Sequence, residues 1–336
     1  MAGTSASERT TENIDGGEDN MNRVVARFIG LVVFLGAAVV ALADDALKVA
    51  VPQRGAWDAG LTELGKRGGI FKKHGLDVEV LYTQAGPESI QALIGGSIDI
   101  AVASGVSAAV GTFAKGAPIR IIGSEIIGAP DQYWYVRADS AVRKIEDFND
   151  KTVAYSLTGS SSHANLLALI AQYKLTAKPT STGSITATLT QTLTGQVDVG
   201  FSAIPFFLDK VDAGQIRIIA TGNDVTALKA RTGRVNLTNV ATLQNRKEVI
   251  ARFHRAYKET VDWMYSDPAA LKHFADFSTL PEKVVARVRE LLPKDTMNPD
   301  RVVGMDQIIA EARAQKFIAA PLTPAQVAEL IQIPKP

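Results

Sequence analysis

Residues 76–103 read LDVEVLYTQAGPESIQALIGGSIDIAVA, and the order of patterns within this stretch decides the fold class. Leu76 to Tyr82 alternates apolar and polar residues, which predicts a strand, and Pro87 to Ile94 is a short helix that ends at Gly95-Gly96. Ile98 to Ala103 is a second, mostly apolar strand. A strand, a helix and a further strand at this spacing predict an α/β fold with a mostly parallel sheet, covered by helices on both faces.

The same alternation extends along the chain on both sides of this stretch. In the first part it predicts strands at Leu47–Val51 and Ile119–Gly123, and helices at Trp57–His74 and Ser107–Lys115. It then starts again, with strands predicted at Gln132–Arg137, Thr152–Tyr155, Val197–Phe201 and Ile216–Ala220, and helical segments at Ile145–Phe148, Ser161–Tyr173, Ser184–Leu193 and Pro205–Asp212. Residues 129–222 are therefore predicted to form a second α/β lobe, inserted whole into the first.

Beyond residue 223 the pattern turns helical and predicts no new sheet. Helices are predicted at Lys247–Tyr265, Ala269–Phe277, Glu282–Leu291, Val302–Gln315 and Pro324–Ile331. These helices indicate a return to the first lobe, which would comprise residues 44–128 and 223–336. Two lobes joined by two hinge crossings form a cleft, and in open α/β sheets ligands bind beyond the carboxyl ends of the strands.

The composition narrows the class of ligand. The chain has 36 Lys and Arg against 35 Asp and Glu, so no bulk charge attracts DNA, RNA or an anionic membrane. A small neutral-to-anionic ligand fits better than a polymer, and no nucleic-acid partner is expected. The chain has no cysteine, which removes disulfides, thiolate metal sites, cysteine nucleophiles and the acylated cysteine of a bacterial lipoprotein.

Residues 21–43 read MNRVVARFIGLVVFLGAAVVALA, which is typical of a secretory signal peptide. Arg23 and Arg27 form the basic start, an apolar run follows, and Ala41-Leu42-Ala43 is a cleavage site of the A-x-A kind. The alternative is a membrane anchor, but the apolar run is shorter than the roughly 20 residues that a spanning helix needs. We expect cleavage after Ala43 and a product free in a Gram-negative periplasm. Residues 1–20 form an acidic upstream extension, which suggests that translation starts at Met21.

The sharpest candidate site is the segment YSLTGSSSH, residues 155–163, where a strand leads through a glycine turn into a helix. The N–H groups and positive dipole end of a helix start attract anions, and Ser160, Ser161 and Ser162 add uncharged donors. The alternative is that one serine is only a helix cap, and both interpretations can hold at once. His163 has no His, Cys or carboxylate at metal-ligand spacing, so it is predicted as a polar wall position. No metal site is expected.

Three further loops are predicted to line the same cleft. In the loop that contains Gln53, Arg54 could pair with a carboxylate or sulfonate and Trp57 could form an apolar wall. The alternatives are a solvated charge for Arg54 and a core aromatic for Trp57. The other two loops place small hydroxyls between a strand and a helix, and their candidate residues are Ser104 and Gly105 in the first lobe and Ser202 and Pro205 in the second.

Five sequence blocks resemble the periplasmic substrate-binding proteins of ABC importers for nitrate, taurine and aliphatic sulfonates, a group that includes binders of thiamine-pyrimidine precursors. The matching blocks are GIFKKHGLDV (69–78), ALIGGSIDIA (92–101), AKGAPI (114–119), GSSSH (159–163) and LTGQVDV (193–199). The resemblance covers Leu47 to Thr221 well and the C-terminal helices in general character. Several of these blocks end helices and start strands, so they identify the fold better than the ligand.

The resemblance implies a two-lobed, type II-like periplasmic-binding-protein fold that closes on its ligand as a Venus flytrap does. It places the acidic group of the ligand against Ser160 to His163, with contacts from the opposite lobe at Gln53 to Trp57 and Ser104 to Gly105. It also implies a monomer that delivers a small organic anion, without a cofactor, to an inner-membrane permease and its ATPase. The cleft loops lack a dense basic cluster, which argues against a multiply charged ligand.

Enzymatic readings have less support in the sequence. Thiamine-pyrimidine synthases share the resemblance, but they work inside the cell and depend on a cysteine-rich segment, which this chain lacks. Residues 159–163 lack the G-x-S-x-G nucleophile elbow, and no H-E-x-x-H or P-loop motif is present. We therefore expect no catalysis. The remaining alternatives are a thiamine-pyrimidine-precursor binder and an exported sensing module without a transport role.

Overall fold

The structure is a computed structural model that describes residues 44–335. The predicted upstream extension and signal peptide, residues 1–43, lie outside the described residues. Within the described part of the chain, none of the helices combines the length and apolar character needed to cross a membrane.

The first sheet has five strands in the order β2-β1-β3-β10-β4. The strands are β1 (Asp45–Pro52), β2 (Leu76–Thr83), β3 (Ile100–Gly105), β4 (Ile119–Ser124) and β10 (Arg234–Asn239). β1 pairs in parallel with β2 and β3, whereas β10 runs antiparallel between β3 and β4. The sequence analysis predicted no new sheet after residue 223 and missed β10, which joins the first sheet. The helices that follow β10 do return to this sheet.

Side chains alternate between the two faces of this sheet, as the period of a strand requires. Val49 and Val51 enter one apolar core, and Ala50 enters the other. The first core is covered by α2 (Leu61–Arg67), α3 (Ile70–Lys73), α10 (Lys247–Ser266) and α11 (Pro268–Ser278). The second core is covered by α4 (Gly86–Ile94), α5 (Val106–Ala114), α14 (Met305–Ala314) and α15 (Pro324–Leu330). Helices therefore cover both faces of the first sheet, as predicted.

The helix predicted over Trp57–His74 is shorter and divided. Trp57 to Gly60 form turns, α2 ends at Arg67, and α3 begins after Gly69. Gly69 has φ +71°, a left-handed conformation that a helix interior does not allow and that glycine adopts without strain. The break lets Phe71 turn into the core against Phe253, with ring centroids 5.4 Å apart.

Residues 132–221 form a second group of strands and helices. β5 (Gln132–Arg137) lies between β8 (Gly200–Ala203) and β9 (Ile216–Thr221), antiparallel to both. β6 (Thr152–Tyr155) pairs in parallel with β7 (Lys178–Ser181), a strand that the sequence analysis missed. The expectation of a mostly parallel sheet is therefore wrong here. The remaining elements are the 3-10 turn η1 (Ile145–Phe148), α6 (Ser161–Tyr173), α7 (Ile185–Leu193) and α8 (Leu208–Asp212).

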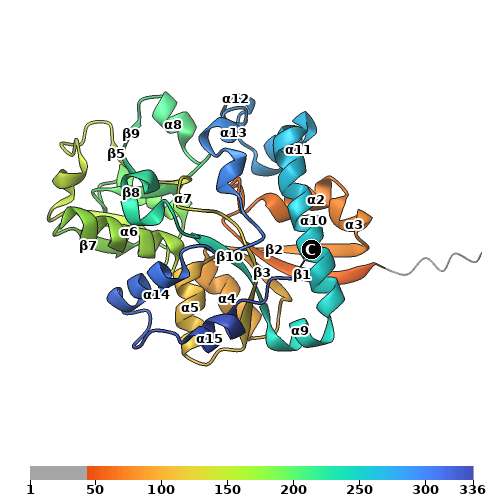
Figure 1. The fold of residues 1–336 in the computed structure, drawn as a ribbon. Coiled ribbons are helices and arrows are strands. Elements are labelled where there is room, and N and C mark those ends of the chain that lie inside the picture. The colour runs from red at the N-terminus through yellow and green to blue at the C-terminus, as the bar shows by residue number, and fades with distance from the viewer. Residues whose placement is uncertain (1–43, 336) are drawn as a thin grey trace, which may run out of the picture. The chain divides into compact units, whose positions relative to one another are not determined.

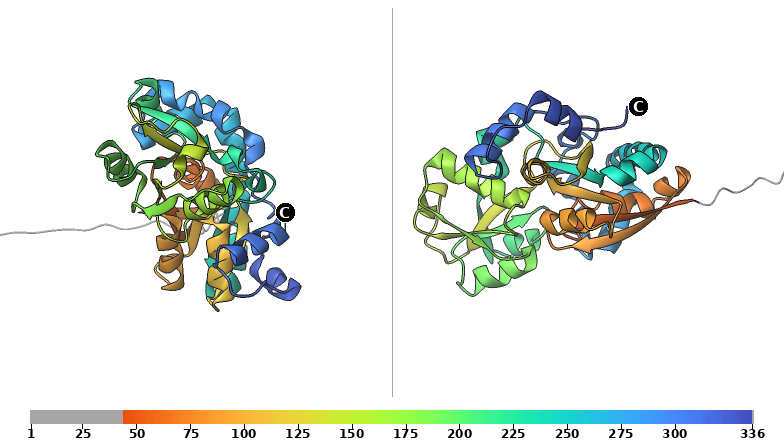
Figure 2. Two further views of the ribbon diagram at one scale, coloured as in Figure 1. Left: turned by 90° about the vertical axis from the view of Figure 1, so that its left-hand side faces the viewer. Right: turned by 90° about the horizontal axis from the view of Figure 1, so that it is seen from below.

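The chain passes between the two groups twice, from β4 to β5 and from β9 to β10. Figures 1 and 2 show the yellow-green β5 and the green β8 and β9 grouped apart from the red and orange β1 and β2. The segments that complete the fold are η2 (Gly222–Asp224), η3 (Thr226–Leu228), α9 (Val240–Asn245), α12 (Glu282–Val285), α13 (Val288–Leu291) and η4 (Lys294–Thr296). The α/β class and the two-lobed fold are confirmed. The boundaries between the two lobes, at residues 128/129 and 222/223, remain a prediction.

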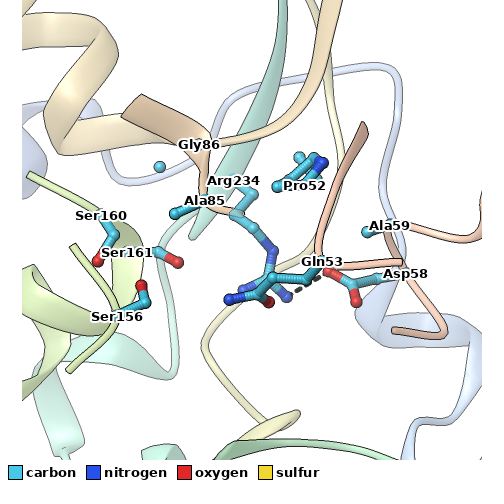
Figure 3. A pocket seen from close by; sticks show the side chains of 12 residues that line it. Pro52, Gln53, Asp58, Ala59, Ala85, Gly86, Ser156, Ser160, Ser161 and Arg234 are labelled. Atoms are coloured by element: carbon cyan, nitrogen blue, oxygen red, sulfur yellow. Dashed lines mark ion pairs between the residues drawn. The ribbon is translucent and has the colours of Figure 1, made fainter. Parts of the chain in front are cut away.

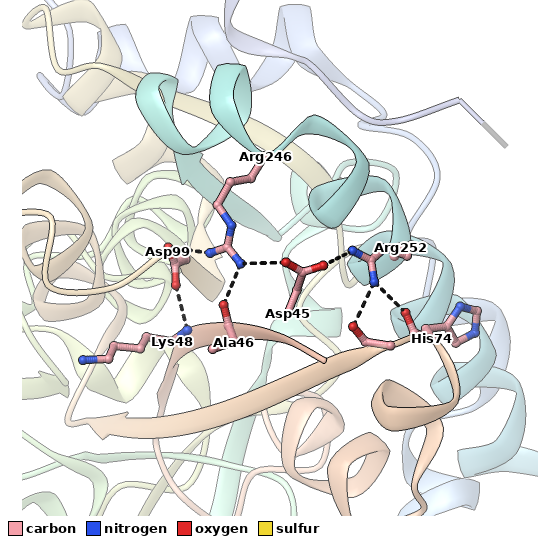
Figure 4. A network of polar contacts seen from close by, with 8 residues as sticks. Asp45, Ala46, Lys48, His74, Asp99, Arg246 and Arg252 are labelled. Atoms are coloured by element: carbon pink, nitrogen blue, oxygen red, sulfur yellow. Dashed lines mark hydrogen bonds and ion pairs between the residues drawn. The ribbon is translucent and has the colours of Figure 1, made fainter. Parts of the chain in front are cut away.

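A polar network ties the start of β1 to the start of α10 (Figure 4). Asp45 pairs with Arg252, and Arg246 donates to the carbonyl oxygen of Ala46 at 2.7 Å. Arg246 also lies 3.3 Å from Asp99, which precedes β3. These contacts fix one end of β1, so that the loop after its other end, at Pro52, is held by an anchored strand.

Candidate functional site

A cavity lies where the loops after several strands meet (Figure 3). The space inside it is about 20 Å³, close to the room that one water molecule needs, so its walls lie close together. The lining residues from the first group are Pro52, Gln53, Asp58, Ala59, Ala85, Gly86, Ala103, Gly105 and Arg234, and those from the second group are Ser156, Ser160 and Ser161. Both groups of elements therefore contribute walls to one small site.

Ser160 is the cap of α6. Its backbone is extended and its hydroxyl oxygen accepts from the backbone N–H of His163 at 3.2 Å, which satisfies one of the free donors at the helix start. Ser162 is 2 % exposed and its hydroxyl lies 2.8 Å from that of Ser160 and 3.0 Å from that of Ser156. The three serines thus form a fixed hydroxyl cluster under the helix start.

Ser161 faces the cavity at the first helical position. Its hydroxyl oxygen accepts from the side-chain amide of Gln132 at 3.1 Å, and the amide oxygen of Gln132 accepts from Asn165 at 3.0 Å. Because this oxygen already accepts a hydrogen bond, the hydroxyl proton is free to donate into the cavity. The first N–H groups of a helix have no partner within the helix, so they add donors at the same point.

Gly105, the last residue of β3, lies directly against this helix start. A Cβ atom placed on Gly105 would lie 3.0 Å from the backbone nitrogen and 3.2 Å from the Cα atom of Ser161. A side chain would therefore force the two elements apart. The absence of a side chain at position 105 lets β3 and α6 close the cavity between them.

Arg234 enters the same cavity because β10 runs antiparallel to β3. In that register Arg234 pairs with Gly105. Its Nη2 atom lies 2.5 Å from Asp58 and 2.9 Å from Asp131, and its Nε atom lies 3.6 Å from Glu125. Nε and Nη2 are buried and lack well-aligned hydrogen bonds, so ion pairing rather than linear hydrogen bonding holds this cluster.

Burial sets the charge state of this cluster. Burial and the nearby Asp58 hold the pKa of Glu125 well above its usual value, and burial also raises the pKa of Asp131. Burial opposes the charged form of Arg234, but the three surrounding carboxyl groups outweigh it and raise the pKa of Arg234. Arg234 is therefore charged, and Glu125 holds a proton over a wider pH range than an exposed glutamate does.

The structure brings only some of the predicted site residues to this cavity. Gln53, Gly105, Ser160 and Ser161 line it. The others do not: Ser162 lies behind Ser160, and the hydroxyl groups of Ser104 and Ser202 are fully buried without a hydrogen-bond partner. Pro205 follows β8 outside the lining. Whether any of these residues binds a ligand stays a prediction.

Arg54 and Trp57 lie elsewhere. Trp57 is fully buried, with ring centroids 4.9 Å from Phe274 and 5.9 Å from Tyr265, and its indole N–H donates to the Tyr265 hydroxyl at 3.0 Å. Arg54 is exposed and its guanidinium lies 5.4 Å from the ring centre of Tyr82. Trp57 is therefore a core aromatic and Arg54 a surface charge. These are the structural alternatives that the sequence analysis gave for the two residues.

His163 points away from the cavity. Its ring stacks on Tyr155 at 4.3 Å between centroids and meets Phe317 edge-on, and its Nδ1 atom accepts from the N–H of Gly159 at 3.2 Å. Burial lowers the pKa of His163, so the ring is neutral at pH 7. His163 and Phe317 line a separate hollow next to the start of α6.

A family model described as NMT1/THI5 like matches residues 63–271. The chain belongs to the NMT1/THI5-like family. The matched range contains Ser160, Ser161 and Arg234, so the family covers most of the cavity. A comparison with curated protein sequences finds no match.

Solved structures similar to this NMT1/THI5-like protein include two aliphatic sulfonate-binding proteins and a nitrate-binding protein. SsuA from Escherichia coli aligns with a TM-score of 0.70 and 20 % identity over 87 % of this chain and 93 % of that one. SsuA from Xanthomonas axonopodis bound to MOPS gives 0.72 and 21 % over 88 % and 100 %. NrtA from Synechocystis gives 0.67 and 12 % over 85 % and 86 %. At these identities the likeness shows the periplasmic-binding-protein fold.

Asp58 and Arg234 are the cavity residues of this NMT1/THI5-like protein that the sequence analysis missed. Arg234 lies on β10, the strand that was not predicted. Asp58 directly follows Trp57, and the sequence analysis selected Trp57 from this loop as the candidate site residue. Arg234-Val235-Asn236-Leu237 does alternate polar and apolar residues, which is the signal that could have revealed the strand. Among residues 44–335, no group of three His, Asp or Glu side chains is arranged to hold a metal ion.

Proposed function

We propose that this NMT1/THI5-like protein is an exported solute-binding protein of an ABC importer. It captures a small organic anion, a sulfonate, carboxylate or related acid, and delivers it to a membrane permease. The observation that carries this proposal is the start of α6, where the free hydroxyl proton of Ser161 and the first helix N–H groups face the cavity.

The cavity offers an anion donors from two sides. The start of α6 supplies hydroxyl and N–H groups, and Arg234 supplies a guanidinium between that start and the loop of Gln53 (Figure 3). Hydrogen bonds to a charged group are stronger than those between neutral groups, by roughly twofold. A small acid can therefore leave water for this site without losing hydrogen bonds.

The two crossings of the chain support capture by hinge motion. The walls of the cavity come from elements on both sides of the segments that link β4 to β5 and β9 to β10. Opening at those segments admits the ligand, and closing brings Gly105 back against Ser161. In the periplasm, where the predicted leader would send the protein, the closed form presents the ligand to the permease.

The contacts of the cavity serines support binding without turnover. A nucleophilic serine needs a base within hydrogen-bond reach, and the contact of the Ser161 hydroxyl is the neutral amide of Gln132. His163 is sequence-adjacent, but its Nδ1 atom faces the Gly159 N–H. These contacts support a role for the serines as donors to a ligand rather than as nucleophiles.

A thermal-shift screen of small sulfonates, carboxylates, nitrate and aminopyrimidines tests the proposal on the chain without residues 1–43. A ligand at 100 times its dissociation constant raises the free energy of unfolding by about 2.7 kcal/mol. We expect at least one organic acid to do so, and to be recovered chemically unchanged after prolonged incubation. If no member of the screen stabilises the protein, or the best one is recovered altered, the proposal is wrong.

A further inference from the structure

Three buried polar side chains lead from Ser161 away from the cavity. The hydroxyl oxygen of Ser161 lies 3.1 Å from the amide nitrogen of Gln132, and the amide oxygen of Gln132 lies 3.0 Å from the amide nitrogen of Asn165. The amide oxygen of Asn165 lies 3.5 Å from the Nη2 atom of Arg231. Gln132, Asn165 and Arg231, called here the amide network, are only 2 %, 3 % and 2 % exposed, so they depend on one another for hydrogen bonds.

Arg231 gives the amide network its direction. Its Nε atom lies 2.9 Å from the carboxylate of Glu311, and its Nη1 atom donates to the carbonyl oxygen of Thr232 at 3.2 Å, so the guanidinium is held in place. A guanidinium only donates hydrogen bonds, so Asn165 must face it with its amide oxygen. The opposite orientation would bring N–H groups of both residues together away from water, and burial of polar groups without partners is costly.

This direction passes from residue to residue as far as the cavity. With its oxygen toward Arg231, Asn165 turns its NH2 group toward Gln132, which must accept with its amide oxygen. The NH2 group of Gln132 therefore faces Ser161 and donates to its hydroxyl oxygen. Because Ser161 lines the cavity, its proton is left for an acceptor there.

We propose that Gln132 is a positioning residue of the anion site, and that Arg231, acting through Asn165, fixes its direction. This inference rests on the proposed function. Gln132 lies outside the cavity lining and acts through Ser161. A serine hydroxyl can donate or accept, and Gln132 keeps this one turned as a donor. The oxygen of an acid then meets a donor that is already oriented, which lowers the cost of binding.

Asn165→Asp should reverse the amide network without changing Ser161 or Gln132. A carboxylate only accepts hydrogen bonds, so the new side chain draws the NH2 group of Gln132 toward itself and turns the amide oxygen of Gln132 toward Ser161. The Ser161 hydroxyl then donates to Gln132 and presents its lone pairs to the cavity. The new carboxylate lies beside the guanidinium of Arg231, and such a charge-assisted contact favours the folded state.

A double-mutant cycle with Ser161→Ala tests the effect on binding. The probes are ethanesulfonate, butanoate and nitrate, measured by isothermal titration calorimetry at pH 7.5. Asn165→Asp should weaken the tightest-binding probe roughly tenfold or more, because a donor to a charged group is lost. In the Ser161→Ala background the same substitution should change the affinity less than about twofold. A fall of equal size in both backgrounds would show that the added charge acts directly on the acid, and it would overturn the proposal.

Neutron diffraction from crystals of the unliganded, deuterium-exchanged protein reads the direction of the amide network without a ligand. We expect the deuterons of the Gln132 amide to face Ser161 in the wild type and Asn165 in no more than the reversed variant, Asn165→Asp. A wild-type Gln132 amide with its oxygen toward Ser161 would contradict the proposal.

The two experiments separate this inference from the proposed function. If none of the three acids binds the wild type, the result counts against the proposed function, and the neutron map alone decides the direction of the amide network. Should Asn165→Asp not fold, Gln132→Met takes its place in the cycle. It removes the donor to the Ser161 oxygen, so it should weaken binding in the wild type and change little in the Ser161→Ala background.

Discussion

The backbone of Ser161 lies so close to Gly105 that a methyl group at position 105 would approach its nitrogen to 3.0 Å. The contact joins the last residue of β3 to the first residue of α6, so the proposed hinge opening would break it. The atoms that the methyl group would meet are the backbone and Cβ atoms of Ser161, which have little freedom to move aside. The stability of the closed form therefore depends on the absence of a side chain at this position.

Gly105→Ala is expected to weaken ligand binding. Overpacking of this kind costs about 1–3 kcal/mol, and here it falls on the closed form alone. The affinity for the best acid from the screen should fall roughly five- to hundredfold, with little change in the free energy of unfolding. Gly95→Ala is the matched control, because Gly95 lies outside the cavity lining and its Cβ would meet nothing closer than 3.4 Å. Equal effects of the two substitutions on affinity would contradict this account.

Ser161→Ala and Ser160→Ala should separate binding from capping. Loss of a hydrogen bond to a charged ligand costs about 1.5–3 kcal/mol, so Ser161→Ala should weaken binding of the best acid roughly ten- to hundredfold. Ser160→Ala removes the cap of α6 and should lower the free energy of unfolding by about 1 kcal/mol. Calorimetry and urea denaturation measure the two effects. Unaltered affinity in Ser161→Ala would place the acid elsewhere in the cavity.

Arg234→Met should destabilise the fold by about 3–5 kcal/mol near neutral pH, because it leaves three buried carboxyl groups without their cation. Without the cation the pKa values of Glu125 and Asp131 rise further, so the native state binds more protons than the unfolded chain. Stability is then regained as the pH falls. Urea denaturation at pH 7.5 and pH 5 measures this. Arg54→Met, an exposed arginine outside the cavity, should change little at either pH.

Glu125→Gln should stabilise the protein at neutral and higher pH. Because burial raises the pKa of Glu125 in the folded protein, the native state retains a proton that the unfolded chain releases above about pH 4.3. The stability of the wild type therefore declines as the pH rises from there to the folded pKa. The glutamine lacks this dependence, so its advantage should grow across that window and vanish at pH 4. A pH-independent difference would show that Glu125 does not hold the proton.

Local signals explain which parts of the fold could be predicted. α6 begins at Ser161 and ends at Tyr173 as predicted, because a glycine turn, a capping serine and an apolar periodicity all lie within the segment itself. β5 and β6 also have their predicted bounds. β10 was missed because it is a single short strand among helices, and its pairing with β3 and β4 involves residues more than a hundred positions away.

The same distinction applies to the site. Ser160 and Ser161 could be predicted because a helix start is a local feature. The role of Arg234 depends on Asp58 and Asp131, which lie far away in sequence, and no local pattern links the three. Trp57 shows the reverse case. Its loop follows a strand, as a site residue does, but the packing of Phe274 and Tyr265 around its ring is tertiary and decides its place.

The position of β10 between β3 and β4 governs the order in which the protein can be completed. β10 pairs with both β3 and β4 and joins them in one sheet, and it begins only at Arg234. A nascent chain that has reached residue 221 already holds every strand of the second group, yet its first sheet still lacks an interior strand. Such long-range pairing slows folding. In the proposed export of the chain, this delay keeps the larger sheet open until about seven tenths of the sequence has been made.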